Sequence, residues 1–137
     1  MAGLQEFVDA QDKHWPQILG EMRDGRKATH WIWYVFPQLA TLGRSAMARH
    51  FGLSGIEEAG TYLAHPVLGP RLVTCAELLL QHPERTPEEI LGTVDALKVR
   101  SCMTLFEAAT DAPGVFGEVL ERLYSGSRCP ETLRQIG

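Results

Sequence analysis

Residues 25–39, GRKATHWIWYVFPQL, decide how the fold of this chain is interpreted. Two cations and a histidine lead into two tryptophans, a tyrosine and a phenylalanine, and Pro37 and Gln38 follow. The central WIWYVF is rich in residues that favour β-strands. It is nevertheless too short and too uniformly apolar for its periodicity to separate a strand from a buried helix. The stretch therefore predicts either a short strand or a buried helical turn that ends before Pro37.

Helix signals flank this stretch on both sides. Apolar spacing before it predicts helices over 4–11 and 16–24, with Gly25 as the C-cap of the second. After it, capping boxes are predicted at Ser54 to Glu57 and at Thr86 to Glu89. The helices expected beyond residue 40 cover 45–52, 57–65, 73–82, a segment that starts at 87, 94–109, 115–124 and a last turn or two from 129.

The helix expected over 94–109 has an apolar stripe that is predicted to face inward, formed by Val94, Leu97, Ser101, Cys102, Leu105 and Ala109. With helices predicted everywhere outside the opening stretch, we expect an all-α fold. It forms a single compact domain over residues 1–137, with about seven short-to-medium helices. One small two-stranded element near residues 30–38 is the alternative for the opening stretch.

Length and charge limit the classes of protein to which this chain can belong. A chain of 137 residues corresponds to one domain. Its 13 cations and 17 carboxylates give a net charge of −4, which argues against general nucleic-acid binding. The N-terminus lacks the regions of a signal peptide, and the longest apolar run, Trp31 to Pro37, is too short to span a bilayer. We therefore expect a cytoplasmic protein with no nucleic-acid or membrane partner, and its oligomeric state stays open.

The three cysteines, Cys75, Cys102 and Cys129, form no C-x-x-C pair and fit no zinc spacing. Reduced thiols in a cytosolic protein are the expected state. No thiol-enzyme motif surrounds Cys102, and no histidine or carboxylate spacing is typical of a metal site. The sequence therefore predicts no metal and no cofactor.

Four stretches together carry a resemblance to a known family: GRKATHWIWYVFPQ, Gly43-Arg44-Ser45, YLAHPVLGPRL and DALKVRSCMTLF. In this order and spacing they resemble the domain-of-unknown-function 1810 family, which is mainly bacterial and often labelled calpastatin. The likeness extends from Phe7 to Leu133, although Cys129-Pro130 stands where the family leads us to expect an acidic residue. It implies a mainly α-helical single domain and brings no established activity. It does not imply calpain inhibition, because a calpastatin repeat is a disordered peptide.

A second, looser likeness is to the NADAR proteins, which act on compounds of the ADP-ribose type. That family pairs an aromatic motif near its start with a later helix that carries a cation, a methionine and a phenylalanine. Here Asp95-Ala96-Leu97-Lys98, followed by Met103 and Phe106, is similar in style. This likeness implies a phosphorylated, nucleotide-like ligand.

The first group of candidate site residues lies in the opening stretch. Its cations could bind a phosphate group, and its histidine could carry a proton near neutral pH. The structural alternative is that the cations neutralise the negative end of the preceding helix. The aromatic side chains include core residues, and one face could stack on a ligand ring. The side-chain amide of Gln38 either forms hydrogen bonds with a polar edge of the ligand or completes a turn. The candidates are Lys27, His30, Trp31, Trp33, Tyr34 and Gln38.

The second group comes from two later segments, and it comprises His65, Arg71, Asp95, Lys98 and Ser101. Arg71 lies in the first turn of a helix, where the helix dipole disfavours a cation. A bound anion or a carboxylate partner, from Glu57, Glu58 or Asp95, would offset that cost. Asp95, Lys98 and Ser101 share one helical face. Asp95 and Lys98 form either an ordinary surface ion pair or, together with Ser101, a site in which they serve as an acid, a phosphate partner and a hydroxyl group.

From these groups we expect a pocket built from three segments that are distant in sequence. The leading hypothesis is binding, and hydrolysis of the N-glycosidic type, of a phosphorylated nucleotide-like ligand of the ADP-ribose class. Asp95, Lys98 and His30 are the candidate catalytic residues. The alternative is a non-enzymatic module that binds a protein or peptide through the Trp31–Phe36 aromatic patch. A third hypothesis is that these polar residues form a buried salt-bridge network that stabilises the fold and binds no ligand.

Overall fold

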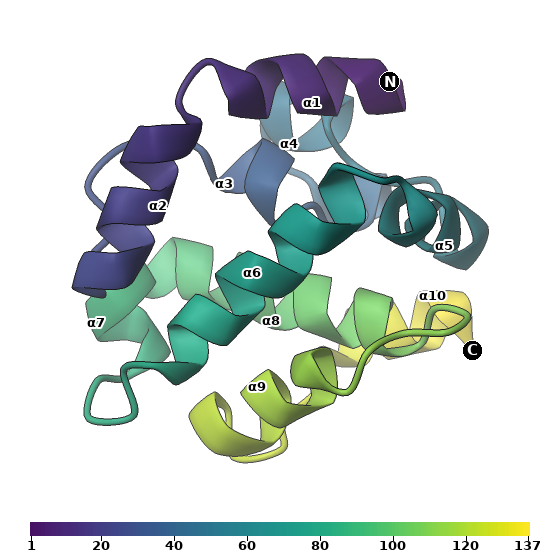
Figure 1. Cartoon of the computed structure of the whole chain (residues 1–137). Helices are drawn as coiled ribbons and strands as arrows, with labels where there is room; N and C mark the ends of the chain where they lie inside the picture. Colours follow the sequence, from purple (N-terminus) through teal and green to yellow (C-terminus); the bar gives the residue numbers. More distant parts are fainter.

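Helices α6 (Leu68–Leu80) and α8 (Thr93–Glu107) occupy the middle of the molecule, and α9 (Val115–Leu123) packs against both of them (Figure 1). The computed structural model describes all residues from Met1 to Gly137. The other elements are α1 (Leu4–Asp12), α2 (Trp15–Asp24), α3 (Ile32–Val35), the 3₁₀-helix η1 (Ala40–Leu42), α4 (Ala46–His50), α5 (Ile56–Ala64), α7 (Pro87–Leu91) and α10 (Pro130–Ile136).

The fold is all-α, as the sequence predicts. Ten α-helices form rather than about seven. All except α3 lie on segments for which the sequence predicts a helix or a helical turn, and α3 is the helical alternative for the opening stretch. The opening stretch forms the four-residue helix α3, and its C-cap Phe36 precedes Pro37. The two-stranded alternative does not form, because the one β-type pairing is an isolated parallel bridge between Leu39 and Leu53.

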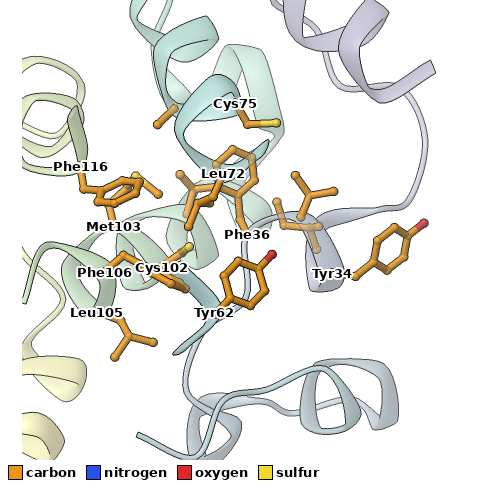
Figure 2. Close-up of a cluster of buried hydrophobic side chains, with 14 of the residues drawn as sticks. Tyr34, Phe36, Tyr62, Leu72, Cys75, Cys102, Met103, Leu105, Phe106 and Phe116 are labelled. Carbon is orange, nitrogen blue, oxygen red and sulfur yellow. The ribbon is translucent and has the colours of Figure 1, made fainter. Parts of the chain in front are cut away.

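The core is one continuous cluster that contains side chains from most of the helices. A row of aromatic contacts crosses it. The ring centroids are 5.3 Å apart for Phe7 and Tyr62, 5.4 Å for Tyr62 and Phe106, and 5.9 Å for Phe106 and Phe116. Figure 2 shows the last three of these rings together with Leu72 and Met103. This row joins α1, α5, α8 and α9, which are distant in sequence, into one packed unit.

Local capping signals explain where several helices begin and end. Gly25 ends α2 with φ of 69°, a left-handed conformation that favours glycine. Thr86 and Glu89 form the predicted capping box of α7. The box predicted at Ser54 is wrong, because α5 begins one residue later, with Gly55 as a cap that has no side-chain acceptor. Glu58 instead accepts a hydrogen bond of 2.8 Å from the Ser54 backbone N–H.

The inward face of α8 differs in part from the prediction. Ser101, Cys102, Leu105 and Ala109 are buried, but Val94 and Leu97 are 65% and 54% exposed. The first two turns bury a neighbouring stripe, represented by Ala96 and Val99. Both stripes have helical spacing, so periodicity alone could not choose between them. The neighbours α5, α7, α9 and α10 decide which side of α8 is covered.

No single helix combines the length and the apolar character that crossing a membrane requires. The pair α5 and α6 passes such a test only when taken together, and the two helices meet at an angle of 94°.

Gly69, in the first turn of α6, lies against the backbone at the end of α5. A Cβ atom there would lie 2.0 Å from the backbone oxygen of Leu63. We expect Gly69→Ala to lower the free energy of unfolding by about 1–3 kcal/mol, because backbone must move to relieve the overlap. Gly60→Ala in α5 is the matched control, because its Cβ meets nothing within 4 Å. The control should be neutral or raise stability by up to about 1 kcal/mol. Urea unfolding of both variants checks this, and equal effects would contradict it.

Candidate functional site

Asp95, in the first turn of α8, lies between two lysines from different parts of the chain. Its Oδ2 is 2.8 Å from Nζ of Lys27, and its Oδ1 is 3.8 Å from Nζ of Lys98. Each ammonium also lies over an indole ring. Lys27 is 5.1 Å from the ring centroid of Trp31, and Lys98 is 5.8 Å from that of Trp33. Five predicted site residues therefore meet in one cluster.

This cluster is partly closed to solvent. The Lys27 side chain is only 6% exposed and that of Asp95 18%. The Lys27 backbone N–H is held by the Ile90 carbonyl at 2.7 Å, so the main chain is anchored as well. Lys27 is therefore placed as a structural partner of Asp95, and Lys98 is the more accessible of the two cations.

Glu21, near the C-terminal end of α2, holds the loop that leads into the cluster. It accepts hydrogen bonds from the Ala28 N–H at 2.6 Å, the Thr29 N–H at 3.0 Å, the Thr29 hydroxyl at 2.6 Å and the Trp31 indole at 3.0 Å. Burial alone would raise the pKa of this carboxyl group. The hydrogen bonds from Thr29, Ala28 and Trp31 outweigh burial and lower the pKa of Glu21 from 4.5 to about 2.

Sequence reasoning missed Glu21, although a signal existed. An acidic residue in the last turn of a helix opposes the helix dipole. Such a residue is therefore expected to have another reason to be there, and here that reason is the four donors of the following loop.

Arg71 lies apart from the lysine cluster. It pairs with Asp12 of α1 at 2.8 Å and stacks over the Trp15 ring at 4.6 Å. Asp12 is thus the carboxylate that offsets its unfavourable place in α6, instead of Glu57, Glu58 or Asp95. The Gln11 amide oxygen also accepts from Arg71 at 3.4 Å. The expected gathering of Lys27, Lys98 and Arg71 around one hollow does not occur.

Both candidate histidines lie outside the lysine cluster. Nδ1 of His65 accepts from the backbone N–H groups of Val67 and Leu68, at 3.1 and 3.3 Å, and so completes the turn before α6. His30 is exposed and lines a separate depression of about 200 Å³, together with Trp31 and Tyr34. The structure therefore does not bring His30 to Asp95 and Lys98.

The Trp31–Phe36 segment does not form an exposed aromatic patch. Trp31 and Phe36 are 1% exposed, and Tyr34 is also buried. Trp33 is the one partly exposed aromatic side chain of the segment. This burial removes the surface on which the protein- or peptide-binding alternative depends.

An open cleft of about 540 Å³ lies beside α8, on the side where Lys98 emerges. Its walls come from the segment after α3, from the start of α4, from α8 and from the start of α10. The lining residues are Gln38, Leu42, Arg44, Ser45, Ala48, Val94, Leu97, Lys98, Arg100, Ser101, Cys129 and Glu131. Gln38, Ala48 and Lys98 also line a narrow inner recess that reaches Trp33 and Phe36. We call the cleft and its recess the α8 cleft.

Cations outnumber carboxylates in the α8 cleft. Arg44, Lys98 and Arg100 line it, against the single carboxylate Glu131. Glu131 is itself paired with Arg134 of the same helix. The cleft therefore favours an anionic ligand within a protein whose overall charge is negative.

Two buried nitrogens of the α8 cleft and its recess, Nε1 of Trp33 and Nε of Arg100, have no hydrogen-bond partner in the protein. Gln38 also lines the cleft; the residue is 9% exposed, and its side-chain oxygen and nitrogen are not among the buried atoms that lack a partner. Because buried polar groups are nearly always satisfied, the two nitrogens are available to pair with water or with a ligand.

Three predicted candidates line the α8 cleft or its recess with Gln38: Trp33, Lys98 and Ser101. Sequence reasoning missed Arg44, Arg100 and Cys129. A partial signal existed for Arg44, since Gly43-Arg44-Ser45 is one of the stretches that carry the family resemblance. Spacing could not reveal Cys129, because it approaches Lys98 only after α8 and α10 pack together. Arg100 is two residues from Lys98 on α8, but only the packed structure shows that both residues line one cleft.

The fold and the cleft define a single-domain, all-α protein with an open, cation-lined cleft beside its central helix. The chain belongs to the family described as protein of unknown function, DUF1810, whose model matches residues 1–136. It is also similar to the crystal structure of the conserved hypothetical protein Rv1873 from Mycobacterium tuberculosis. The two are 45% identical with a TM-score of 0.95, over 97% of this chain and 95% of that one. No curated protein matches the chain.

These findings confirm the resemblance to the family. They do not concern the NADAR proteins, so that likeness stays a prediction.

Proposed function

We propose that this protein binds a small phosphorylated, nucleotide-like ligand in the α8 cleft. The observation that carries the proposal is the excess of cations in the cleft, which is lined by Arg44, Lys98 and Arg100 and by a single carboxylate, Glu131. The buried Nε of Arg100 and Nε1 of Trp33 add two hydrogen-bond donors without a partner. A ligand that offers both a negative charge and a polar edge would pair with these groups.

The dimensions and the lining of the α8 cleft support this ligand class. Its volume of about 540 Å³ is within the usual range for small-molecule sites. Arg44, Lys98 and Arg100 would pair with phosphate oxygens, and arginine can do so with two parallel hydrogen bonds. Val94 and Leu97 add an apolar rim against which a base or sugar could pack.

The proposal concerns binding and not hydrolysis. Asp95, the expected acid or base, is engaged by Lys27 and Lys98 and does not line the cleft. The three free thiols suit a protein of the reducing cytoplasm, where we place it.

The test is a thermal-shift and calorimetric titration with ADP-ribose, AMP, adenosine and inorganic phosphate. A ligand at 100 times its dissociation constant stabilises the folded protein by ~2.7 kcal/mol. We expect the phosphorylated nucleotides to stabilise the protein and adenosine to do so far less. Absence of a shift with every phosphate-bearing compound would overturn the proposal.

Two variants test whether the ligand binds in the α8 cleft. Gln38→Ala and Lys98→Gln should each weaken binding by about tenfold or more, because each removes a partner in a partly buried site. Arg122→Gln is the matched control, since Arg122 forms an exposed pair with Glu118 in α9 and does not line the cleft. If all three variants bind equally well, the ligand does not occupy the α8 cleft.

A further inference from the structure

The inner recess of the α8 cleft is very small. Its volume is about 10 Å³, which is room for one water molecule or for one oxygen atom of a ligand. Apolar side chains and three polar ones line it, and no carboxylate does: the residues are Ile32, Trp33, Phe36, Gln38, Ala48 and Lys98. The recess can therefore admit a single polar atom but not a whole chemical group.

Two of the polar side chains in the recess can only donate hydrogen bonds. The indole of Trp33 offers one N–H and no acceptor, and the ammonium group of Lys98 offers three N–H donors and no acceptor. Nε1 of Trp33 is buried and has no partner in the protein. Because an unpaired buried donor is unfavourable, an acceptor atom from outside the chain would stabilise this arrangement.

The Lys98 ammonium group lies close to the same indole. It is 5.8 Å from the centroid of the Trp33 ring, and Oδ1 of Asp95 is 3.8 Å from it. The Lys98 side chain is partly exposed and lines both the recess and the open cleft, whereas Asp95 lines neither. An atom in the recess would therefore meet a neutral donor and a positive charge, and an anionic oxygen suits both.

We propose that the recess binds one terminal oxygen of a phosphomonoester and that Trp33 is the residue that selects this oxygen. The subsite rests on the proposed function and narrows its ligand class to compounds with a terminal phosphate. The phosphorus of a terminal phosphate carries a single substituent, so one oxygen can project into a space of atomic size. The other two oxygens stay in the cleft, which Arg44 and Arg100 line. An internal diester would have to fit two substituents around the mouth of the recess.

The indole N–H resonances test this contact in the native protein. The three tryptophans, Trp15, Trp31 and Trp33, give three indole cross-peaks in a proton–nitrogen NMR spectrum. Trp31 already donates to Glu21 at 3.0 Å, and Trp15 packs under Arg71 away from the cleft, so both are internal controls. We expect AMP to shift the Trp33 cross-peak downfield by far the most, and adenosine not to do so. A recess that holds only water would leave this cross-peak in place, which would overturn the inference.

Affinities give a second, independent test. AMP should bind more tightly than ADP-ribose, whose phosphates are internal, and more tightly than cyclic AMP, whose phosphate is a diester. Trp33→Phe should weaken AMP binding by about tenfold or more, because it removes a donor to a charged oxygen, and should leave adenosine binding unchanged. Trp15→Phe is the matched control and should leave every affinity unchanged. Calorimetric titration measures both variants.

The comparison of diesters separates the indole contact from charge alone. AMP carries more negative charge than cyclic AMP, so the cations of the cleft would by themselves favour AMP. If Trp33→Phe binds AMP as tightly as the native protein does, charge alone explains the preference, and Trp33 selects nothing. The NMR result does not depend on how well Trp33→Phe folds, since it is obtained on the native protein.

The outcomes separate this subsite from the proposed function. If ADP-ribose and cyclic AMP bind the native protein as tightly as AMP does and the Trp33 cross-peak stays in place, the subsite is wrong and the binding proposal stands. If ribose 5-phosphate binds as tightly as AMP and shifts the Trp33 cross-peak, the subsite stands and the nucleotide-like class fails. Absence of binding by every phosphate-bearing compound would overturn both.

Discussion

Replacing Glu21 by glutamine should lower the free energy of unfolding at pH 7 by about 2–4 kcal/mol, because each buried donor left unpaired costs ~1–3 kcal/mol. Glu21 accepts from two backbone N–H groups, the Thr29 hydroxyl and the Trp31 indole. A glutamine side chain has one acceptor oxygen, and its NH₂ group would face donors. At least one donor is therefore left without a partner. Urea unfolding measures the loss.

The matched control for this prediction is Glu118→Gln. Glu118 lies on α9 in an exposed pair with Arg122, so its loss should cost no more than about 1 kcal/mol. Equal losses for the two variants would show that the Glu21 network contributes nothing beyond a surface charge.

The same carboxylate predicts how stability depends on pH. The folded-state pKa of Glu21, about 2, is below its ordinary value of 4.5. Its contribution is therefore fully present above pH 4.5 and is lost as the pH falls from 4.5 towards 2. The difference in melting temperature between the native protein and Glu21→Gln should shrink over this interval. A difference that is constant from pH 2 to pH 5 would contradict the assignment.

Asp95→Asn is expected to be the second large loss, about 3 kcal/mol, because removing one partner of a buried ion pair leaves the other charge uncompensated. The charge left behind is that of Lys27, whose side chain is 6% exposed. Asparagine keeps the shape of the side chain but offers no negative charge to the ammonium at 2.8 Å. Chemical denaturation of the folded variant measures the effect.

A double-mutant comparison separates this structural role from a catalytic one. Lys27→Met should cost less than Asp95→Asn, because Asp95 keeps Lys98 at 3.8 Å. Combining Lys27→Met with Asp95→Asn should recover part of the loss of Asp95→Asn, since no buried ammonium then lacks a partner. If Asp95→Asn leaves stability unchanged, the pair has no structural role and the predicted acid–base role of Asp95 regains support.

Much of the fold could be predicted from local signals. The Thr86 capping box and the Gly25 C-cap involve residues within one turn of each other, so their geometry depends little on the rest of the chain. Asp95, Lys98 and Ser101 lie on one helical face, but only Lys98 and Ser101 reach the α8 cleft. The predicted site was therefore correct that Lys27 and Lys98 meet Asp95, wrong that Arg71 and His30 join them, and incomplete about which residues share a cleft.

The errors have one physical cause. Arg71 was expected beside Lys27, but the packing of α6 against α2 and the contact with α1 give it Asp12 and Trp15 as partners. Val94 and Leu97 were expected inside, but the neighbours of α8 cover its adjacent face. Each outcome depends on contacts between distant segments, which spacing along the chain does not encode.

The amino-acid sequence by itself determined the all-α fold, the positions of most helices and the family of this protein. These properties follow from caps and apolar periods that act over a few residues. Only the tertiary structure decided that Gln38, Lys98 and Cys129 line one cleft, and that Lys27 and Arg71 are engaged elsewhere. The reason is that a cleft is formed by side chains from several helices, and these side chains come together only when the helices pack against one another.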